Sequence, residues 1–292
     1  MNRVSWLILA AIWAPITSAK LDPQQALSHA PPMAIFEAWA KPIEPFQMAL
    51  QVWYVGTENL SSILITTPEG HLLIDAGLDQ SAELIKSNIE RLGFKVGDIQ
   101  YLLNSHARLD QAGGLAKMKA WSGARLITSR ENAKQLALGG AEDFALGDAL
   151  LFPPVIVDRE IRNRERFYLG GVEITALLTP GHLPGATSWK IKLSNKDVLI
   201  YADSLATPDY YLINNKNYPT IVDDLNNSFA VLSEQKVDIF IASKGERFNL
   251  KDKINQYKKG DQRAFYDREG LARYVDLSKA ALNKQLEAQT TK

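Results

Sequence analysis

The sequence lacks cysteine altogether and contains only four histidines, at positions 29, 71, 106 and 182. Without cysteine the chain can form no disulfide, offer no thiolate to a metal and use no cysteine nucleophile. At 292 residues it is long enough to be stabilised by a hydrophobic core alone. Because the histidines are so few, each can be assessed individually as a metal ligand or catalytic base.

The sequence also lacks an excess of either charge, since 33 Lys and Arg balance 33 Asp and Glu. No overall field would therefore draw the protein to nucleic acid or to an anionic membrane. The lysines between residues 251 and 259 predict a solvated helix face rather than a nucleic-acid site. With 46% hydrophobic and 23% charged residues the composition is that of a globular protein, and a monomer is the default expectation.

A long membrane-spanning run is missing as well. The apolar stretch Val4 to Ile16 is shorter than the ~20 residues that a spanning helix needs, and it contains Pro15. It follows Arg3 and ends at the small residues Thr17-Ser18-Ala19, as in a cleaved secretory signal. We predict a signal peptide at residues 1–19 and one mature domain at residues 20–292, free of the membrane after cleavage. The alternative is an uncleaved membrane anchor.

The hydrophobic periodicity predicts an α/β fold. Residues 20–48 are a proline-punctuated lead-in without a domain of their own. Strands are predicted at 48–55, 62–66, 71–75, 99–104, 125–128, 167–178, 187–193, 198–202 and 238–242. Helices are predicted at 81–92, 113–121, 129–136, 221–235 and 263–289, with Ser129 as an N-cap. Strands and helices recur in two similar halves, which predicts two mixed β-sheets packed face to face with helices outside.

Two polar loops follow buried strands in this pattern. The first, Asn104 to Gly114, contains His106 and Asp110, and its two glycines are expected to permit a tight turn into the next helix. The second, Thr179 to Gly185, displays His182. Strand-end loops on a rigid scaffold are common places for catalytic groups. Two histidines on two such loops indicate a shared metal ion.

These loops resemble the zinc-binding segments of the metallo-β-lactamase superfamily. Ser105 to Gly114 is similar to its HxHxDH segment, and Pro180-Gly181-His182 to its next zinc-binding loop. Further likeness, to subclass B3 in particular, lies at residues 55–57, 70–77, 201–205 and 218–229. The resemblance runs from about Trp39 to the C-terminus. It implies an αββα sandwich and a periplasmic hydrolase that opens β-lactam rings with zinc.

Three of the six expected zinc ligands differ from that family pattern, and the combination resembles a variant group within subclass B3. Arg108 stands at the second histidine, Gln111 at the third and Lys244 at the late histidine. Arginine has no lone pair to offer, and lysine would first have to lose its proton. Glutamine offers only a neutral carbonyl oxygen, a weak ligand for zinc.

The resemblance therefore implies a reduced metal site. His106, His182 and Asp110 remain as ligands, enough for one weakly bound zinc at most. Asp110 would also orient the attacking water and pass on its proton, so it is the predicted catalytic residue. Arg108, Gln111, Lys244 and Ser204 are the predicted substrate contacts, the two cations replacing the charge of a second zinc.

Structural alternatives exist for each of these residues. His106 and His182 could be satisfied polar loop residues, Asp110 could form an ion pair with Arg108, and Ser204 could cap a helix or turn. Asp75 is expected to support the loop around Arg108 rather than to bind metal. His71 is expected to make structural hydrogen bonds, and His29 to lie on the surface.

Two other functions remain open at this point. A metal-free binding protein could use Arg108 and Lys244 to capture an anionic ligand. Alternatively, the hydrolase could act on a lactone or a phosphoester, since fold alone does not decide substrate.

Overall fold

The computed structural model describes residues 33–291. The predicted signal peptide, its cleavage site and His29 lie outside the described residues. Within residues 33–291, no helix is both long and apolar enough to cross a membrane.

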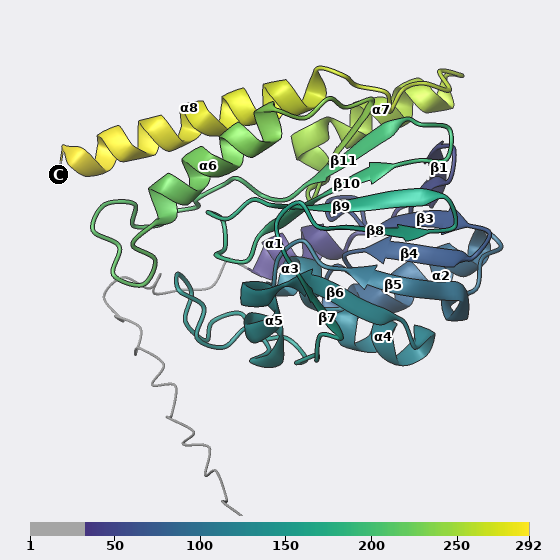
Figure 1. The fold of residues 1–292 in the computed structure, drawn as a ribbon, viewed down its shortest axis with the longest axis horizontal. Coiled ribbons are helices and arrows are strands. Elements are labelled where there is room, and N and C mark those ends of the chain that lie inside the picture. The colour runs from purple at the N-terminus through teal and green to yellow at the C-terminus, as the bar shows by residue number, and fades with distance from the viewer. Residues whose placement is uncertain (1–32, 292) are drawn as a thin grey trace, which may run out of the picture.

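Two β-sheets form the centre of the molecule (Figure 1). The seven-stranded sheet runs in sequence order: β1 (Phe46–Ala49), β2 (Val52–Tyr54), β3 (Ile63–Thr67), β4 (Gly70–Ile74), β5 (Ile99–Leu103), β6 (Arg125–Ser129) and β7 (Arg159–Ile161). The five-stranded sheet has the order β12 (Ile239–Ala242), β11 (Val198–Ala202), β10 (Thr187–Lys192), β9 (Val172–Leu178) and β8 (Arg166–Leu169). Strands β1 to β4 form an antiparallel meander, and β4 to β7 pair in parallel.

Helices cover the outer faces of both sheets, which confirms the predicted αββα sandwich (Figure 1). The helices are α1 (Met33–Ala40), α2 (Ala82–Arg91), α3 (Leu109–Ala112), α4 (Leu115–Ser122), α5 (Arg130–Ala137), α6 (Ile221–Ser233), α7 (Leu250–Lys258) and α8 (Gly270–Thr290). Helices α2, α4 and α5 lie against the seven-stranded sheet, and α6 and α8 lie over the five-stranded one. Ser129 caps α5 as predicted, because its hydroxyl accepts the Asn132 amide.

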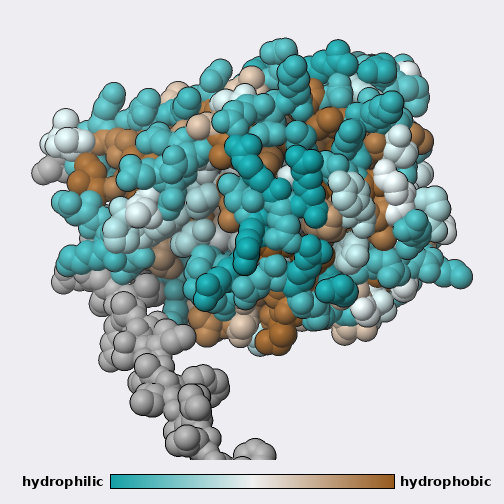
Figure 2. Space-filling model, viewed as in Figure 1, coloured by the Kyte–Doolittle hydropathy of each residue, from teal (hydrophilic) through white to brown (hydrophobic). Residues whose placement is uncertain are grey.

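The main hydrophobic core lies between the two sheets. Alternation along β3 and β4 divides their side chains: Ile63, Ile65, Leu72 and Ile74 face the other sheet, whereas Leu64 and Leu73 face the helices. Each fully buried side chain of this kind contributes about 1.5–3 kcal/mol. The face in Figure 2 is mainly hydrophilic, with apolar side chains in small separate patches.

Two predicted strands are hairpins in the structure. The run 48–55 is divided into β1 and β2 by a turn at Gln51, whose φ is 65°. The run 167–178 is divided into β8 and β9 at Gly170 and Gly171, with φ of 50° and 83°. Glycine adopts such angles freely and marks a turn, whereas glutamine does not. The Gln51 turn is therefore one that local sequence does not indicate.

Other predictions of local structure differ in detail. The lead-in contains helix α1, and the last helix begins at Gly270 rather than at residue 263. Strand β7 was not predicted, since its three residues carry no clear periodicity.

Gly113 and Gly114 were expected to permit a tight turn into the next helix, and this reason for the two glycines is wrong. Both have ordinary right-handed helical angles, so no special turn conformation is needed. A Cβ on Gly113 would instead lie 2.6 Å from the Asp79 amide nitrogen, and one on Gly114 would lie 2.4 Å from the Ala76 carbonyl oxygen. These glycines allow the α3–α4 junction to approach the backbone that follows β4.

Candidate functional site

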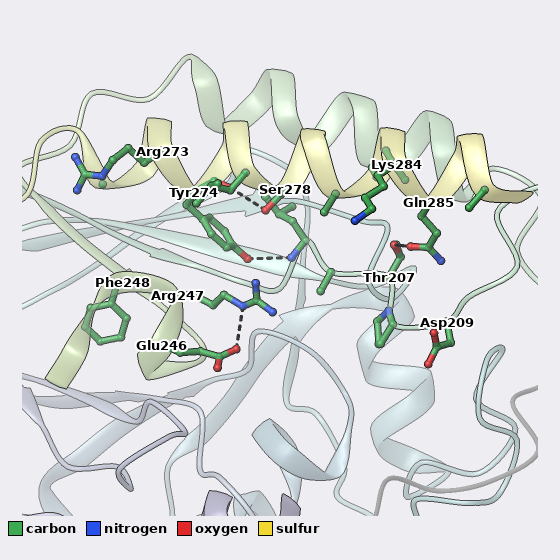
Figure 3. A pocket seen from close by; sticks show the side chains of 18 of the residues that line it. Thr207, Asp209, Glu246, Arg247, Phe248, Arg273, Tyr274, Ser278, Lys284 and Gln285 are labelled. Atoms are coloured by element: carbon green, nitrogen blue, oxygen red, sulfur yellow. Dashed lines mark hydrogen bonds and ion pairs between the residues drawn. The ribbon is translucent and has the colours of Figure 1, made fainter. Parts of the chain in front are cut away.

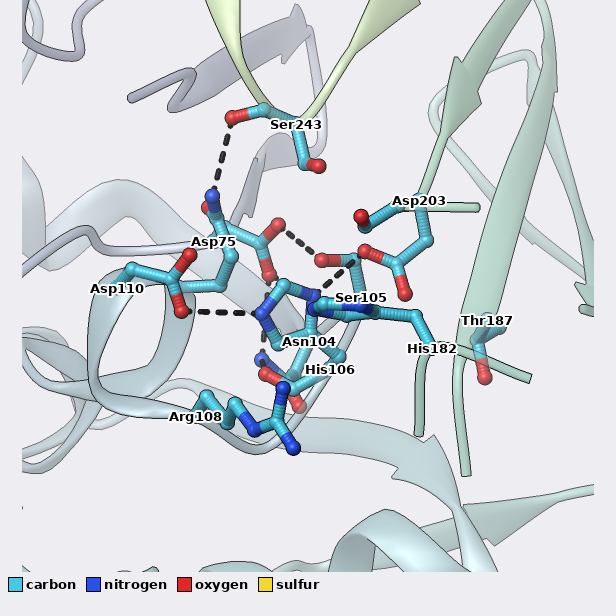
Figure 4. Close-up of polar contacts among 12 residues, drawn as sticks. Asp75, Asn104, Ser105, His106, Arg108, Asp110, His182, Thr187, Asp203 and Ser243 are labelled. Carbon is cyan, nitrogen blue, oxygen red and sulfur yellow. Dashed lines mark hydrogen bonds and ion pairs between the residues drawn. The ribbon is translucent and has the colours of Figure 1, made fainter. Parts of the chain in front are cut away.

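The predicted site residues come together where several strands end. His106 and Asp110 follow β5, His182 follows β9, and Lys244 follows β12. Gly181 presents His182 with a φ of 135°, and a Cβ there would lie 2.4 Å from the Leu225 side chain. Figure 4 shows His106, Asp110 and His182 grouped between the two halves of the fold. The rings of His106 and His182 have centroids 5.0 Å apart.

His106 lies between two carboxylates. Its Nδ1 is 2.6 Å from Asp203 Oδ1, and its Nε2 is 3.1 Å from Asp110 Oδ1 (Figure 4). Burial alone lowers the pKa of His106, but Asp203 and Asp110 outweigh burial and raise that pKa to about 10. Because carboxylates only accept hydrogen bonds, both ring nitrogens donate in this arrangement.

Asp110, on α3, is the centre of the charged cluster. Its Oδ2 lies 3.3 Å from Lys244 Nζ. Burial raises the pKa of Asp110, yet the charges of Lys244 and His106 hold it well below the usual carboxyl value. Lys244 Nζ also lies 4.0 Å from the centre of the Trp39 ring, a cation–π contact. Asp110 is thus an ionised acceptor.

His182 has a different environment. Its Nδ1 lies 2.6 Å from the Ala206 carbonyl oxygen and 3.4 Å from the Tyr210 hydroxyl. A carbonyl cannot donate, so Nδ1 carries the proton. Burial, followed by the charges of Arg108 and His106, lowers the pKa of His182 well below its usual value. The ring is therefore neutral, and its Nε2 keeps a free lone pair.

Arg108 pairs with Asp143 rather than with Asp110, the partner considered from the sequence. Its Nε and Nη2 donate to the two Asp143 oxygens at 2.7 and 2.8 Å, and Nη1 donates to the Tyr210 hydroxyl. The guanidinium also lies over the rings of Phe144 and Tyr210, at 5.8 and 5.4 Å. Only 7% of the Arg108 side chain is exposed, so this cation ties the 143–144 loop to Tyr210.

Gln111 and Ser204 both contact backbone. Gln111 Nε2 donates to the Ser243 carbonyl at 3.0 Å, next to Lys244, and among the described residues its buried Oε1 accepts no hydrogen bond. The Ser204 hydroxyl accepts the Ala206 amide at 3.3 Å, which is the turn-capping alternative. The hydrogen bonds found for these two side chains within residues 33–291 thus go to backbone atoms.

Asp75 supports the His106 loop, as expected. Its carboxylate accepts the Ser105 amide at 2.7 Å, the Ser105 hydroxyl at 2.5 Å and the Tyr201 hydroxyl at 2.7 Å. Burial raises the pKa of Asp75 to about 7, although these hydrogen bonds counter the rise. His71 accepts the Thr67 amide at 3.4 Å and so has the structural role expected of it.

The side chains at this site offer donors for zinc but do not yet surround a common point. Among residues 33–291, no three His, Asp or Glu side chains are already gathered around one point as a metal requires. The donor chemistry nevertheless fits one ion, provided that His106 gives up its Nε2 proton when the metal binds. His106 and His182 each use Nδ1 for an acceptor, the usual way of orienting Nε2 of a ligand histidine, and the Asp110 carboxylate lies beside them. Two ions do not fit, because Arg108 and Lys244 occupy ligand positions with cations.

Several functional side chains were missed in the sequence. Asp203 contacts His106, and Asp143 contacts Arg108. Tyr210 contacts His182, and Trp39 contacts Lys244. Asp203 could have been found, since it directly follows strand β11 in the run Tyr201 to Leu205. No local sequence pattern marks Asp143, Tyr210 or Trp39 as part of the site.

Comparison with known proteins identifies a matching family and several similar structures. Residues 55–244 match the family model described as the metallo-beta-lactamase superfamily. The HARLDQ-motif metallo-beta-lactamase of Cronobacter sakazakii is 63% identical, with 94% of this chain and 100% of that chain covered and a TM-score of 0.92. His106 to Gln111 spell the same six letters.

Solved subclass B3 and related enzymes are more distant. BJP-1, a subclass B3 metallo-beta-lactamase of Bradyrhizobium japonicum, is 34% identical over 87% of this chain and 98% of that chain, with a TM-score of 0.82. The FEZ-1 metallo-beta-lactamase of Legionella gormanii is 35% identical over 86% and 98%, with a TM-score of 0.83.

A curated relative has a different activity in its name. The N-acyl homoserine lactonase AttM of Agrobacterium fabrum is 26% identical over 179 residues, 51% of this chain. The match spans 65% of the lactonase, which is less than two thirds of its length. The family match over residues 55–244, the αββα fold and the clustered His106, Asp110 and His182 agree, and the chain belongs to the metallo-beta-lactamase superfamily.

Proposed function

We propose that this chain is a hydrolase that opens the β-lactam ring and uses a single zinc ion held by His106, His182 and Asp110. The observation that carries the proposal is the grouping of two Nδ1-anchored histidines with an ionised aspartate. The likeness to two β-lactamases across most of the chain supports the substrate class. We further propose that the chain is exported to the periplasm, on the basis of its N-terminal apolar run, and that it works there as a monomer.

A zinc ion bound there would supply Lewis acidity and favour ionisation of water at neutral pH. Asp110 would orient the attacking water and accept its proton, because its low pKa keeps it ionised. His106 would be held in register by Asp203, and His182 by the Ala206 carbonyl. Each histidine would thereby be restricted to a single orientation before substrate arrives.

The cations of the site would recognise the substrate carboxylate and the anion formed on ring opening. Lys244 is the accessible one, with 23% of its side chain exposed and two hydrogens not directed at Asp110. Arg108 would reach a substrate only with guanidinium hydrogens that Asp143 and Tyr210 leave free. Ser204 and Gln111 would add neutral hydrogen bonds beside the histidines.

The function is tested with the mature chain after removal of metal by chelation. We expect negligible turnover of nitrocefin and of a carbapenem, restored by about one equivalent of zinc per chain. Elemental analysis gives the zinc content, and absorbance gives the rates. Turnover that survives chelation would refute the zinc mechanism, and ligand affinity without turnover would indicate the metal-free binding protein instead.

A second candidate is a lactone hydrolase. It is favoured by the 26% identity to an N-acyl homoserine lactonase. The same zinc-loaded protein is therefore assayed with an N-acyl homoserine lactone by titration of the acid released. Lactone turnover in the absence of β-lactam turnover would replace the first proposal by this one.

Lys244→Met is expected to tighten zinc binding about three- to tenfold. The Lys244 ammonium holds Asp110 Oδ2 and so weakens the carboxylate as a ligand, and removing the ammonium also removes its repulsion of the cation. Competition with a chromogenic chelator measures the affinity, and Lys251→Met, an exposed lysine of α7, is the control. Equal affinities in the two variants would show that the ion pair does not compete with zinc.

A further inference from the structure

The segment from Asp203 to Leu212 links three parts of the proposed site. Asp203 accepts a hydrogen bond from His106, and Ala206 accepts one from His182. Tyr210 contacts both Arg108 and His182. The segment follows β11 and contains no helix or strand of its own, so the regular hydrogen bonds of secondary structure do not fix its course. Its position must come from what it contacts.

Helix α8 holds this segment through side chains at both of its ends. The Tyr274 hydroxyl donates to the Asp203 carbonyl at 2.9 Å and accepts the Leu205 amide at 3.0 Å. Near the other end of the helix, Gln285 and Gln289 both donate to the Tyr210 carbonyl, at 3.0 and 2.7 Å. Their oxygens accept the Thr207 hydroxyl at 2.6 Å and the Leu212 amide at 2.8 Å.

The three side chains form one stripe along α8. At 3.6 residues per turn, positions 274, 285 and 289 fall within about 60° of one another around the helix axis. Figure 3 shows Tyr274 and Gln285 directed at the segment, with Gln285 bonded to Thr207. This stripe of α8 is thus used mainly for binding backbone of the segment.

Apolar packing between α8 and the segment is incomplete. A groove of about 1250 Å³ lies between them, lined by Leu205, Pro208, Leu277 and Ala281 among others (Figure 3). Leu277 is 73% exposed. Leu205, Tyr210 and Leu212 of the segment are nevertheless buried in the main core. The hydrogen bonds from Tyr274, Gln285 and Gln289 therefore act together with this packing to fix the backbone of the segment beside the histidines.

We propose that Gln285 and Gln289 are positioning residues for the zinc site, acting through Tyr210 and Ala206 on the orientation of His182. The inference rests on the proposed zinc site but not on the choice of substrate. A displaced segment would move the Ala206 carbonyl away from His182 Nδ1. The imidazole would then lose the contact that directs Nε2 toward His106 and Asp110. The C-terminal helix would in this way act on the site without contacting it.

The test uses the full mature chain with Gln285→Ala and Gln289→Ala combined. In the metal-free protein, the His182 Nδ1 proton bonded to the Ala206 carbonyl should give a protected imidazole signal in ¹H–¹⁵N NMR, identified by its loss in His182→Gln. We expect exchange of that proton to accelerate about tenfold, and zinc to bind about tenfold more weakly, as with other residues that orient metal ligands.

Leu286→Ala is the matched control, since Leu286 lies between the two glutamines and packs on the core. It should reduce thermal stability as much as the double variant, or more, and leave both the His182 signal and zinc affinity unchanged. If the double variant keeps a protected proton and wild-type zinc affinity, the positioning role is refuted. If both variants lose zinc affinity in proportion to stability, α8 has only a structural role. Neither outcome depends on β-lactam turnover, so the test does not depend on the proposed substrate.

Discussion

Asp110→Asn is expected to lower β-lactam turnover by about 10³-fold, within the range that general acid–base groups contribute. The amide keeps the shape of the side chain but cannot accept the proton of the attacking water. It also removes the negative charge that faces both His106 and Lys244. Measurement of kcat and KM for nitrocefin, with zinc saturating, separates the lost chemistry from weaker metal binding.

Asp252→Asn, an exposed carboxylate of α7, is the control for Asp110→Asn and should behave as the unmodified protein. Zinc content is measured in parallel, because a loss of metal with normal kcat at high zinc would leave Asp110 as a ligand only. A residual rate above one tenth of the original at saturating zinc would contradict the proton-accepting role.

Asp143→Ala is expected to lower the free energy of unfolding by about 3–5 kcal/mol, the usual cost of breaking a buried ion pair from one side. The substitution leaves the Arg108 guanidinium buried with Tyr210 as its remaining side-chain hydrogen-bond partner. It also removes the acceptor of the Ala145 and Leu146 amides. Guanidinium chloride denaturation followed by circular dichroism measures the change.

A paired replacement separates lost charge from lost packing. Arg108→Met combined with Asp143→Leu should recover much of the stability, because apolar residues of similar volume often replace a buried ion pair without cost. If the free energy of unfolding of Asp143→Ala lies within about 1 kcal/mol of that of the original protein, the ion pair contributes little to stability.

The Asp143–Arg108 pair also predicts a pH dependence of stability. Burial raises the pKa of Asp143, but Arg108 and the Ala145 and Leu146 amides outweigh burial and lower it. A carboxyl with a lowered folded pKa stabilises the protein above its unfolded pKa of about 4 and loses that contribution as pH falls through the folded value. The stability difference between the original protein and Asp143→Asn should therefore be constant at neutral pH and shrink in acid.

Much of the fold follows from local sequence, because burial imposes a period on each element. The helices at 81–92, 129–136 and 221–235 and most strands are found close to their predicted ends, namely those at 62–66, 71–75, 99–104, 125–128, 187–193, 198–202 and 238–242. The hairpin turn at Gln51 is one exception that no local signal marks, since tertiary pairing of β1 with β2 places a glutamine at a φ of 65°. The zinc-ligand candidates are also visible in the sequence, because each follows a buried strand.

The partners of those candidates are decided only by the tertiary structure. Arg108 lies two positions from Asp110 in sequence, but it pairs with Asp143, 35 residues away, and with Tyr210, 102 residues away. His106 pairs with Asp203 across 97 residues. These contacts arise because strands of two sheets end at one edge, and no sequence spacing encodes that convergence. The sequence by itself determined which groups can bind a metal, whereas the packing of the sheets and of α8 decided which of them are free to do so.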